Sequence, residues 1–234
     1  MVKKELIQRS PVRIFEKSIH GGLKAGEAGI IASQSGVGKT SVLVQLALDK
    51  LLQGKKVIHV SFNQHSDYVL AWYADIFDEI IKKKNLENAG DVRDEIVRNR
   101  VLLNFNQDGI TDDQIRKSLR ALIVDGGVKA EAVIIDGFDF YRSGRERFEK
   151  VKEFARDLGL EIWYSCTVKG NALYDRRNIP LVIAGYEDLV DVIIILEPRS
   201  DHIELSVPKD RDTFNPEHMG LRLDPKTLLI LEGK

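Results

Sequence analysis

The chain has 234 residues, of which 43% are hydrophobic, and this content is enough for the core of one large or two small domains. Its 35 Lys and Arg residues against 36 Asp and Glu residues give a net charge of -1, which excludes the strong overall positive field typical of polyanion-binding chains. The single cysteine, Cys166, excludes an intrachain disulfide and fits a reducing compartment.

The sequence also lacks the apolar segments of a membrane or secreted protein. Its best apolar run, residues 192–196, is far too short to span a bilayer. The first fifteen residues include basic ones but no apolar signal-peptide region. We therefore expect a soluble, cytoplasmic protein.

Short segments rich in Val and Ile alternate along the chain with longer segments of helical periodicity. We expect strands at residues 28–33, 56–62, 101–105, 132–138, 161–168 and 190–196. We expect helices at residues 39–52, 68–84, 111–124 and 145–158. Because buried strands that alternate with helices pair in parallel, the pattern predicts an α/β fold with a mainly parallel sheet flanked by helices.

After residue 196 the pattern changes to short strands without a helix of any length. The expected strands are 202–209, 220–224 and 227–233, with turn residues between them. Such a series predicts an antiparallel C-terminal extension of the same sheet. We therefore expect residues 1–234 to form one domain.

A glycine-rich segment, SQSGVGKT, connects the first predicted strand to the first predicted helix. It follows the phosphate-loop pattern G-x-x-x-x-G-K-[ST], except that Ser33 replaces the first glycine. In this pattern Gly36 and Gly38 let backbone N–H groups surround a β-phosphate at the positive end of a helix. An ordinary strand-to-helix turn is the alternative, but the flanking strand and helix favour the phosphate loop.

Two side chains of this segment carry specific chemistry. Lys39 can reach the β- and γ-phosphates, and the Thr40 hydroxyl can ligate Mg²⁺. The predicted nucleotide-binding residues are Ser33, Gln34, Ser35, Gly36, Val37, Gly38, Lys39, Thr40 and Ser41. The segment therefore predicts a site for a nucleotide such as ATP.

A carboxylate that completes the Mg²⁺ site is expected at the end of another buried strand. Asp136 follows four apolar residues in AVIIDGF and is the predicted partner of Thr40. A capping Asp at a strand end is the ordinary alternative. Asp139 is a weaker candidate, since it can simply begin the next turn.

Residues 15–47 resemble the start of RecA-superfamily ATPases of the KaiC and DnaB type. Those proteins carry Gly-Gly-Leu, a spacer, Gly-Glu, a strand and the phosphate loop, and the matching residues here are Gly21-Gly22-Leu23 and Gly26-Glu27. DnaB-type loops often have Ala where this chain has Ser33. Later segments resemble the rest of that core in the same order. The resemblance implies a RecA-like P-loop core that binds ATP and Mg²⁺ and forms a homo-oligomer, such as a hexameric ring, or binds a protein partner.

The resemblance also assigns a role to two cations near the C-terminus. In these ATPases a Lys-x-Arg pair reaches the γ-phosphate held by a neighbouring subunit, and the matching residues are Lys209 and Arg211. A cation supplied in this way neutralises charge that grows in the transition state. Two exposed charges at a strand end are the alternative.

The expected catalytic base is missing from this sequence. In these families a glutamate at the end of the strand after the phosphate-loop helix activates water, but the matching stretch here is SFNQH, with Asn63 and Gln64. An amide cannot act as a general base near neutral pH. Either amide can orient water for slow hydrolysis, His65 can substitute as base, or the site can bind ATP with little turnover.

Three functions of different classes follow. We expect foremost a KaiC-like ATP-binding protein, a weak or degenerate ATPase whose nucleotide state controls oligomerisation or partner binding. The alternative is a motor or recombination accessory acting on single-stranded nucleic acid, for which the loop 169–178 offers Tyr174, Arg176 and Arg177. A phosphotransferase is the weakest hypothesis, because no substrate-binding insertion is evident.

Overall fold

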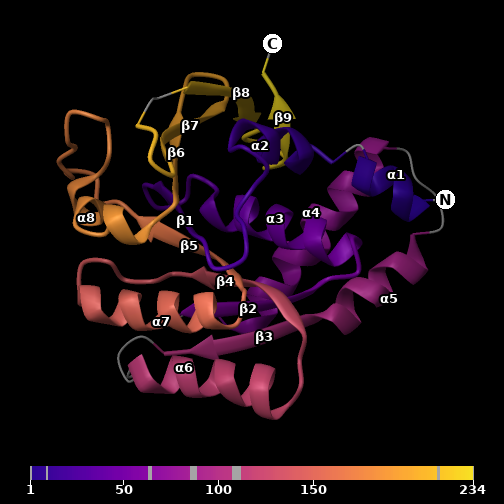
Figure 1. Ribbon diagram of the computed structural model, residues 1–234. Helices are drawn as coiled ribbons and strands as arrows, with labels where there is room; N and C mark the ends of the chain where they lie inside the picture. The colour runs from indigo at the N-terminus through magenta and orange to yellow at the C-terminus, as the bar shows by residue number, and fades with distance from the viewer. Residues whose placement is uncertain are drawn as a thin grey trace.

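The computed structural model describes residues 2–8, 10–62, 65–84, 89–106, 112–214 and 217–233. Its strands form a nine-stranded sheet in the order β3-β2-β4-β5-β1-β6-β7-β8-β9 (Figure 1). The strands are β1 (Ala28–Ser33), β2 (Lys56–Phe62), β3 (Arg100–Phe105), β4 (Ala130–Asp136), β5 (Glu161–Thr167), β6 (Val192–Pro198), β7 (Ile203–Asp210), β8 (Glu217–Leu223) and β9 (Ile230–Glu232). The first six in this order pair in parallel, and β7, β8 and β9 pair antiparallel. The predicted fold class is confirmed.

Helices cover both faces of the sheet, with a separate hydrophobic core under each layer (Figure 1). One layer consists of α1 (Val2–Gln8), α2 (Val12–Ser18), α3 (Lys39–Leu52), α4 (Ser66–Lys84) and α5 (Gly90–Asn99). The other consists of α6 (Asp112–Arg120), α7 (Arg145–Asp157) and α8 (Leu181–Ala184). Successive side chains of a strand enter opposite cores, as Ile134 and Ile135 do, so the central strands are apolar throughout. None of the helices in the described ranges combines the length and apolar character that a bilayer crossing requires.

The parallel strands place the predicted site residues at one edge of the sheet. Ser33 ends β1 and lies opposite Thr167, the last residue of β5. Asp136 ends β4 and lies opposite Ser61 of β2. Only β5 lies between β1 and β4, so the phosphate loop and Asp136 lie close together at the carboxyl edge of the sheet. Ligands of open α/β sheets bind at such carboxyl edges.

The helical layers differ from the sequence prediction in two places. Helices α1, α2 and α5 are additional, and α5 is mostly polar with only Val92 and Ile96 buried, so its periodic signal is weak. The helix predicted at 111–124 is α6, which ends at Arg120 and continues as a π-helical turn, Ala121–Asp125. Residue 111 lies outside the described residues.

The antiparallel C-terminal extension is present and packs against the first turns of α3. Ser41 Oγ donates a hydrogen bond to the carbonyl of Leu228 at 2.5 Å. Gln45 Nε2 donates to the same carbonyl at 2.9 Å, and the backbone N–H of Ile230 donates to Gln45 Oε1 at 2.8 Å. Since Ser41 and Gln45 are both buried, these bonds satisfy polar groups that water cannot reach. The extension is thereby attached to the helix that follows the phosphate loop.

Candidate nucleotide site

The glycine-rich loop between β1 and α3 requires glycine at two positions for different reasons. Gly36 and Gly38 have φ of 77° and 113°, a backbone region that other L-residues rarely adopt. A Cβ added at Gly36 would meet nothing within 4 Å, whereas one added at Gly38 would lie 2.5 Å from Leu223 Cδ2. Gly36 therefore borders open space, and Gly38 is held against the C-terminal extension. Gln34 and Ser35 are exposed, and Val37 is buried in the core.

The backbone at position 33 does not require glycine. Ser33 ends β1 without a positive φ, and its hydroxyl donates a hydrogen bond to the carbonyl of Gln34 at 3.0 Å. The hydroxyl of Ser33 also lies 3.3 Å from Lys39 Nζ, which donates to it. The departure from the glycine pattern is thus accommodated by ordinary strand geometry.

Lys39 folds back over the start of the loop. Its Nζ donates to the carbonyl oxygens of Gln34 at 2.8 Å and Ser33 at 3.2 Å, and only 7% of the residue is exposed. Burial lowers the pKa of Lys39, and the nearby Asp136 carboxylate opposes this effect. The ammonium group is therefore satisfied by loop oxygens that a phosphate could replace.

The predicted pair Thr40 and Asp136 is brought into direct contact. Thr40 Oγ1 donates to Asp136 Oδ2 at 2.8 Å, and Ser165 Oγ donates to Asp136 Oδ1 at 2.6 Å. Ser165 in turn accepts the backbone N–H of Gly137 at 2.7 Å. Asp136 is 5% exposed, and both of its carboxylate oxygens are oriented by hydroxyls, of which that of Ser165 is buried. The sequence reasoning missed Ser165, although a serine inside the apolar strand EIWYSCTV was the available signal.

These oxygens suit Mg²⁺ bound together with a phosphate. Mg²⁺ usually takes one or two protein ligands and completes its shell with water and phosphate oxygens. Within the described residues, no three His, Cys, Asp or Glu side chains gather into a cluster that could hold a metal ion. The Thr40 hydroxyl and Asp136 carboxylate therefore fit a nucleotide-linked Mg²⁺ and do not form a complete protein cage.

Two further polar side chains on β2 were not predicted. Ser61 lies opposite Asp136 in the sheet, and its buried hydroxyl has no hydrogen-bond partner among the described residues. His59 is fully buried, and its Nδ1 lies 3.0 Å from the Tyr73 hydroxyl, while its Nε2 has no such partner in the described chain. Burial lowers the pKa of His59 to about 4, although Asp136 acts in the opposite direction and Arg100 adds to the lowering. His59 is therefore neutral near pH 7.

The candidate substitutes for the missing glutamate lie close to these residues in sequence. Asn63 and Gln64 lie outside the described residues. His65 is exposed, and its Nδ1 lies 3.1 Å from Asp67 Oδ2. Asp139 accepts the backbone N–H groups of Tyr141 at 3.0 Å and Arg142 at 3.2 Å, so it caps a turn as its alternative interpretation predicted.

Lys209 and Arg211 lie near the amino ends of the parallel strands, opposite the edge that carries the phosphate loop. Asp210 at the end of β7 pairs with Val192, and Val192 pairs with Gly29 at the start of β1. Four residue steps along β1 separate Gly29 from Ser33, which corresponds to about 13 Å. The two cations therefore lie far from the phosphate loop of their own chain.

Both cations make contacts within the chain. Lys209 is buried, and its Nζ donates to the carbonyl of Val190. Arg211 forms a bidentate ion pair with Glu27, with N–O distances of 2.7 and 3.0 Å, and a second ion pair with Asp210 at 2.6 Å. Its guanidinium also donates to the carbonyls of Ile19 and Gly22. Arg211 thus fixes the segment before β1 to the end of β7.

The loop 169–178 begins beside the phosphate loop, since the backbone N–H of Val168 donates to the Ser33 carbonyl at 2.8 Å. Arg177 is paired with Asp175 and Glu187, and its guanidinium lies 4.3 Å from the centre of the Phe214 ring. Two carboxylates therefore already compensate a charge that the nucleic-acid hypothesis assigns to phosphate binding.

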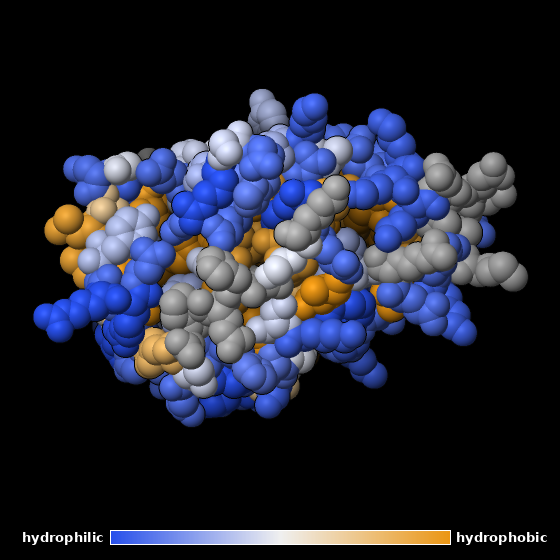
Figure 2. All heavy atoms as spheres, turned by 90° about the horizontal axis from the view of Figure 1, so that it is seen from above, coloured by the Kyte–Doolittle hydropathy of each residue, from blue (hydrophilic) through white to orange (hydrophobic). Residues whose placement is uncertain are grey.

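The surface near this loop carries exposed apolar side chains. Tyr174 and Leu181 are 43% and 49% exposed, and Leu181 begins α8. Hydrophobic side chains are visible at the end of the molecule that carries α8 in a view from above, whereas most of the rest of that face is hydrophilic (Figure 2). Tyr174 and Arg176, which is also exposed, remain the candidates for nucleic-acid contact.

Comparison with known proteins gives one family. A family model described as an AAA domain matches residues 5–158, which is more than half of the chain. The matched part contains the phosphate loop and Asp136 and ends before β5. No curated protein matches the sequence.

Proposed function

This chain belongs to the AAA domain family of P-loop ATPases, and we propose that it binds ATP with Mg²⁺ at the sheet edge where the phosphate loop meets Asp136. The contact between Thr40 Oγ1 and Asp136 Oδ2, at 2.8 Å, carries this proposal. These two residues are distant in sequence, yet their oxygens meet directly beside Lys39, which is the arrangement that phosphate-bound Mg²⁺ requires.

Each residue of the site has a distinct task in this proposal. Gly36 and Gly38 give the loop its left-handed turns, and Lys39 exchanges its bonds to loop carbonyls for bonds to phosphate oxygens. Thr40 and Asp136 hold the metal ion, and Ser165 fixes the carboxylate. A bound Mg²⁺ would neutralise charge on the phosphate oxygens.

We propose that hydrolysis is slow. No carboxylate occupies position 63 or 64, and Asn63 and Gln64 are proposed to orient water without accepting its proton. The loss of a general base costs a factor of about a hundred to ten thousand in rate. His65 is exposed and paired with Asp67, which gives no support to its role as a substitute base.

Lys209 and Arg211 are proposed to act on a nucleotide bound to a second copy of the chain. Their place at the opposite sheet edge supports action in trans, since they are remote from the phosphate loop of their own chain. Arg211 must then exchange its ion pairs with Glu27 and Asp210 for a phosphate. Nucleotide binding would therefore be linked to assembly, as in KaiC-like proteins, and would control oligomerisation or partner binding.

One experiment tests binding, turnover and assembly together. ATP turnover and molecular mass are measured with and without ATP and Mg²⁺ for the wild type and Asn63→Glu. We expect slow turnover by the wild type, a nucleotide-dependent increase in mass, and faster turnover by Asn63→Glu. Brisk turnover by the wild type would contradict the degenerate site, and a mass unchanged by nucleotide would contradict control of assembly.

A further inference from the structure

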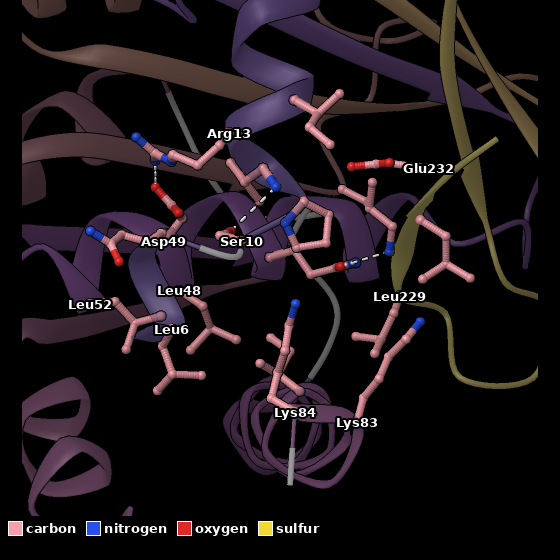
Figure 3. A pocket seen from close by; sticks show the side chains of 18 of the residues that line it. Leu6, Ser10, Arg13, Leu48, Asp49, Leu52, Lys83, Lys84, Leu229 and Glu232 are labelled. Carbon is pink, nitrogen blue, oxygen red and sulfur yellow. Dashed lines mark hydrogen bonds and ion pairs between the residues drawn. The ribbon is translucent and has the colours of Figure 1, made fainter. Parts of the chain in front are cut away.

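A cavity of about 360 Å³ lies beside the second half of α3, away from the phosphate loop (Figure 3). Its walls come from α1, α2, the end of α4 and the segment 229–232, in addition to α3. Neither Asp136 nor any residue of the loop 33–40 lines it. Its volume is within the range of small-molecule sites, about 300 to 1,000 Å³.

The cavity combines an apolar wall with an excess of positive charge. Leu6, Leu48, Leu52 and Ile80 contribute apolar surface from three different helices. The described charged residues that line it are Arg13, Lys17, Lys83 and Lys84 against Asp49 and Glu232, so four cations face two anions. The side chains of Lys83 and Lys84 both extend from the end of α4 toward the cavity (Figure 3).

An ion pair in the wall, between Arg13 and Asp49, contains buried atoms that lack hydrogen-bond partners among the described residues. Asp49 is 1% exposed and pairs with Arg13 through Oδ2, which also accepts a bond from Gln53 Nε2 at 2.6 Å. Arg13 Nε and Asp49 Oδ1 are buried, and neither has a hydrogen-bond partner among the described residues. Because both atoms are also closed to solvent, a ligand in the cavity would leave the Arg13–Asp49 pair in place and contact the other groups of the wall.

We propose that this cavity is a second binding site, for a small organic anion with an apolar body, such as a medium-chain carboxylate. The apolar wall takes the body of the ligand, and the lysines at the end of α4 take the anionic group. Binding at this site requires no nucleotide, so it stands or falls independently of the proposed ATP site.

The test uses decanoate, titrated calorimetrically into the nucleotide-free protein below the concentration at which decanoate forms micelles. We expect saturable binding of one decanoate per chain, which weakens as salt is added. Decylammonium has the same tail and the opposite charge, and we expect it to bind at least tenfold more weakly. Absence of decanoate binding, or equal binding of the two probes, would overturn the proposal.

Two matched pairs of variants locate the binding. Ile80→Trp fills the cavity from α4 and should abolish decanoate binding, whereas Leu70→Trp alters an exposed residue of the same helix outside the cavity and should not. Lys83→Glu should weaken binding by about threefold to tenfold, whereas Lys82→Glu, which changes the adjacent lysine outside the cavity lining, should leave it unchanged. Melting temperatures show which variants fold. Binding that is unaffected by both Ile80→Trp and Lys83→Glu would place the ligand elsewhere and contradict the proposal.

Discussion

The two ends of α3 present different kinds of polar environment. At its start, Lys39 and Asp136 are buried but satisfied, because loop carbonyls and two hydroxyls occupy their hydrogen-bonding groups. Near its end, Arg13 and Asp49 are paired but retain buried atoms without partners. A phosphate at the first end must replace existing hydrogen bonds, whereas a ligand in the cavity near the second end would leave the Arg13–Asp49 pair in place. The helix therefore separates a proposed site at which the ligand displaces existing hydrogen bonds from a proposed site at which it does not.

The largest expected effect concerns the packing of the phosphate loop against the C-terminal extension. Gly38→Ala should lower the free energy of unfolding by about 3 kcal/mol, because it adds both backbone strain and a contact with Leu223. Gly36→Ala adds strain alone and should cost about 1 kcal/mol. Urea unfolding of both variants measures the difference. Equal losses would mean that the extension does not constrain the loop.

The next effect concerns Asp136, the proposed metal ligand. Asp136→Asn should weaken ATP binding in the presence of Mg²⁺ by about ten- to a hundredfold, because the amide is a poorer ligand for a hard cation. Removal of Mg²⁺ with EDTA should weaken ATP binding to the wild type and have little further effect on this variant. Asp139→Asn, three positions along, serves as the control because Asp139 caps a turn. An Asp136→Asn variant that still responds to EDTA would place Mg²⁺ elsewhere.

A smaller effect concerns His59, the buried histidine of β2 whose pKa is also influenced by Asp136. Its folded-state pKa is about 4, below the ordinary value of 6.5, so the unfolded chain binds its proton first as the pH falls. His59 should therefore lower stability by about 2 kcal/mol between pH 7 and pH 5. The free energy of unfolding is measured with urea at pH 7 and at pH 5. We expect it to fall less between these pH values for His59→Gln than for the wild type. An unchanged pH dependence would show that His59 is not held neutral.

The smallest effect would connect the two ends of α3. The segment 228–230 bonds to Ser41 and Gln45, and part of it also lines the cavity. If both proposed sites exist, saturating decanoate should change ATP affinity by about fivefold, and ATP should change decanoate affinity by the same factor. Calorimetric titration of each ligand in the presence of the other measures this coupling. Unchanged affinities would show that the two ends are independent.

The sequence predicted the phosphate-loop end of the molecule well because its chemistry is local. The loop and the start of α3 are contiguous, and the apolar strand before Asp136 marks where the sheet ends. Parallel pairing then places Thr40 and Asp136 at the same edge. A serine inside an apolar strand marks Ser165 as unusual, but its contact with Asp136 depends on the position of β5 between β1 and β4, which the local sequence does not specify.

The cavity end could not be predicted for a related reason. Its walls come from segments that are far apart in the sequence, and α1 and α2 carry no strong periodic signal. Asp49 and Arg13 look like ordinary surface charges until packing brings them together and buries Asp49. The ion pair between Arg211 and Glu27 could not be predicted either, because the two residues are far apart in the sequence.

The most direct test of the central claim is calorimetric titration of ATP with Mg²⁺ into the wild type, Lys39→Ala and Lys24→Ala. Lys24 is an exposed lysine before β1 and controls for the loss of a positive charge. We predict saturable binding to the wild type and Lys24→Ala, and binding about a hundredfold weaker to Lys39→Ala, because a charge-assisted contact to phosphate is lost. No binding by the wild type, or equal binding by Lys39→Ala, would contradict a nucleotide site at the phosphate loop.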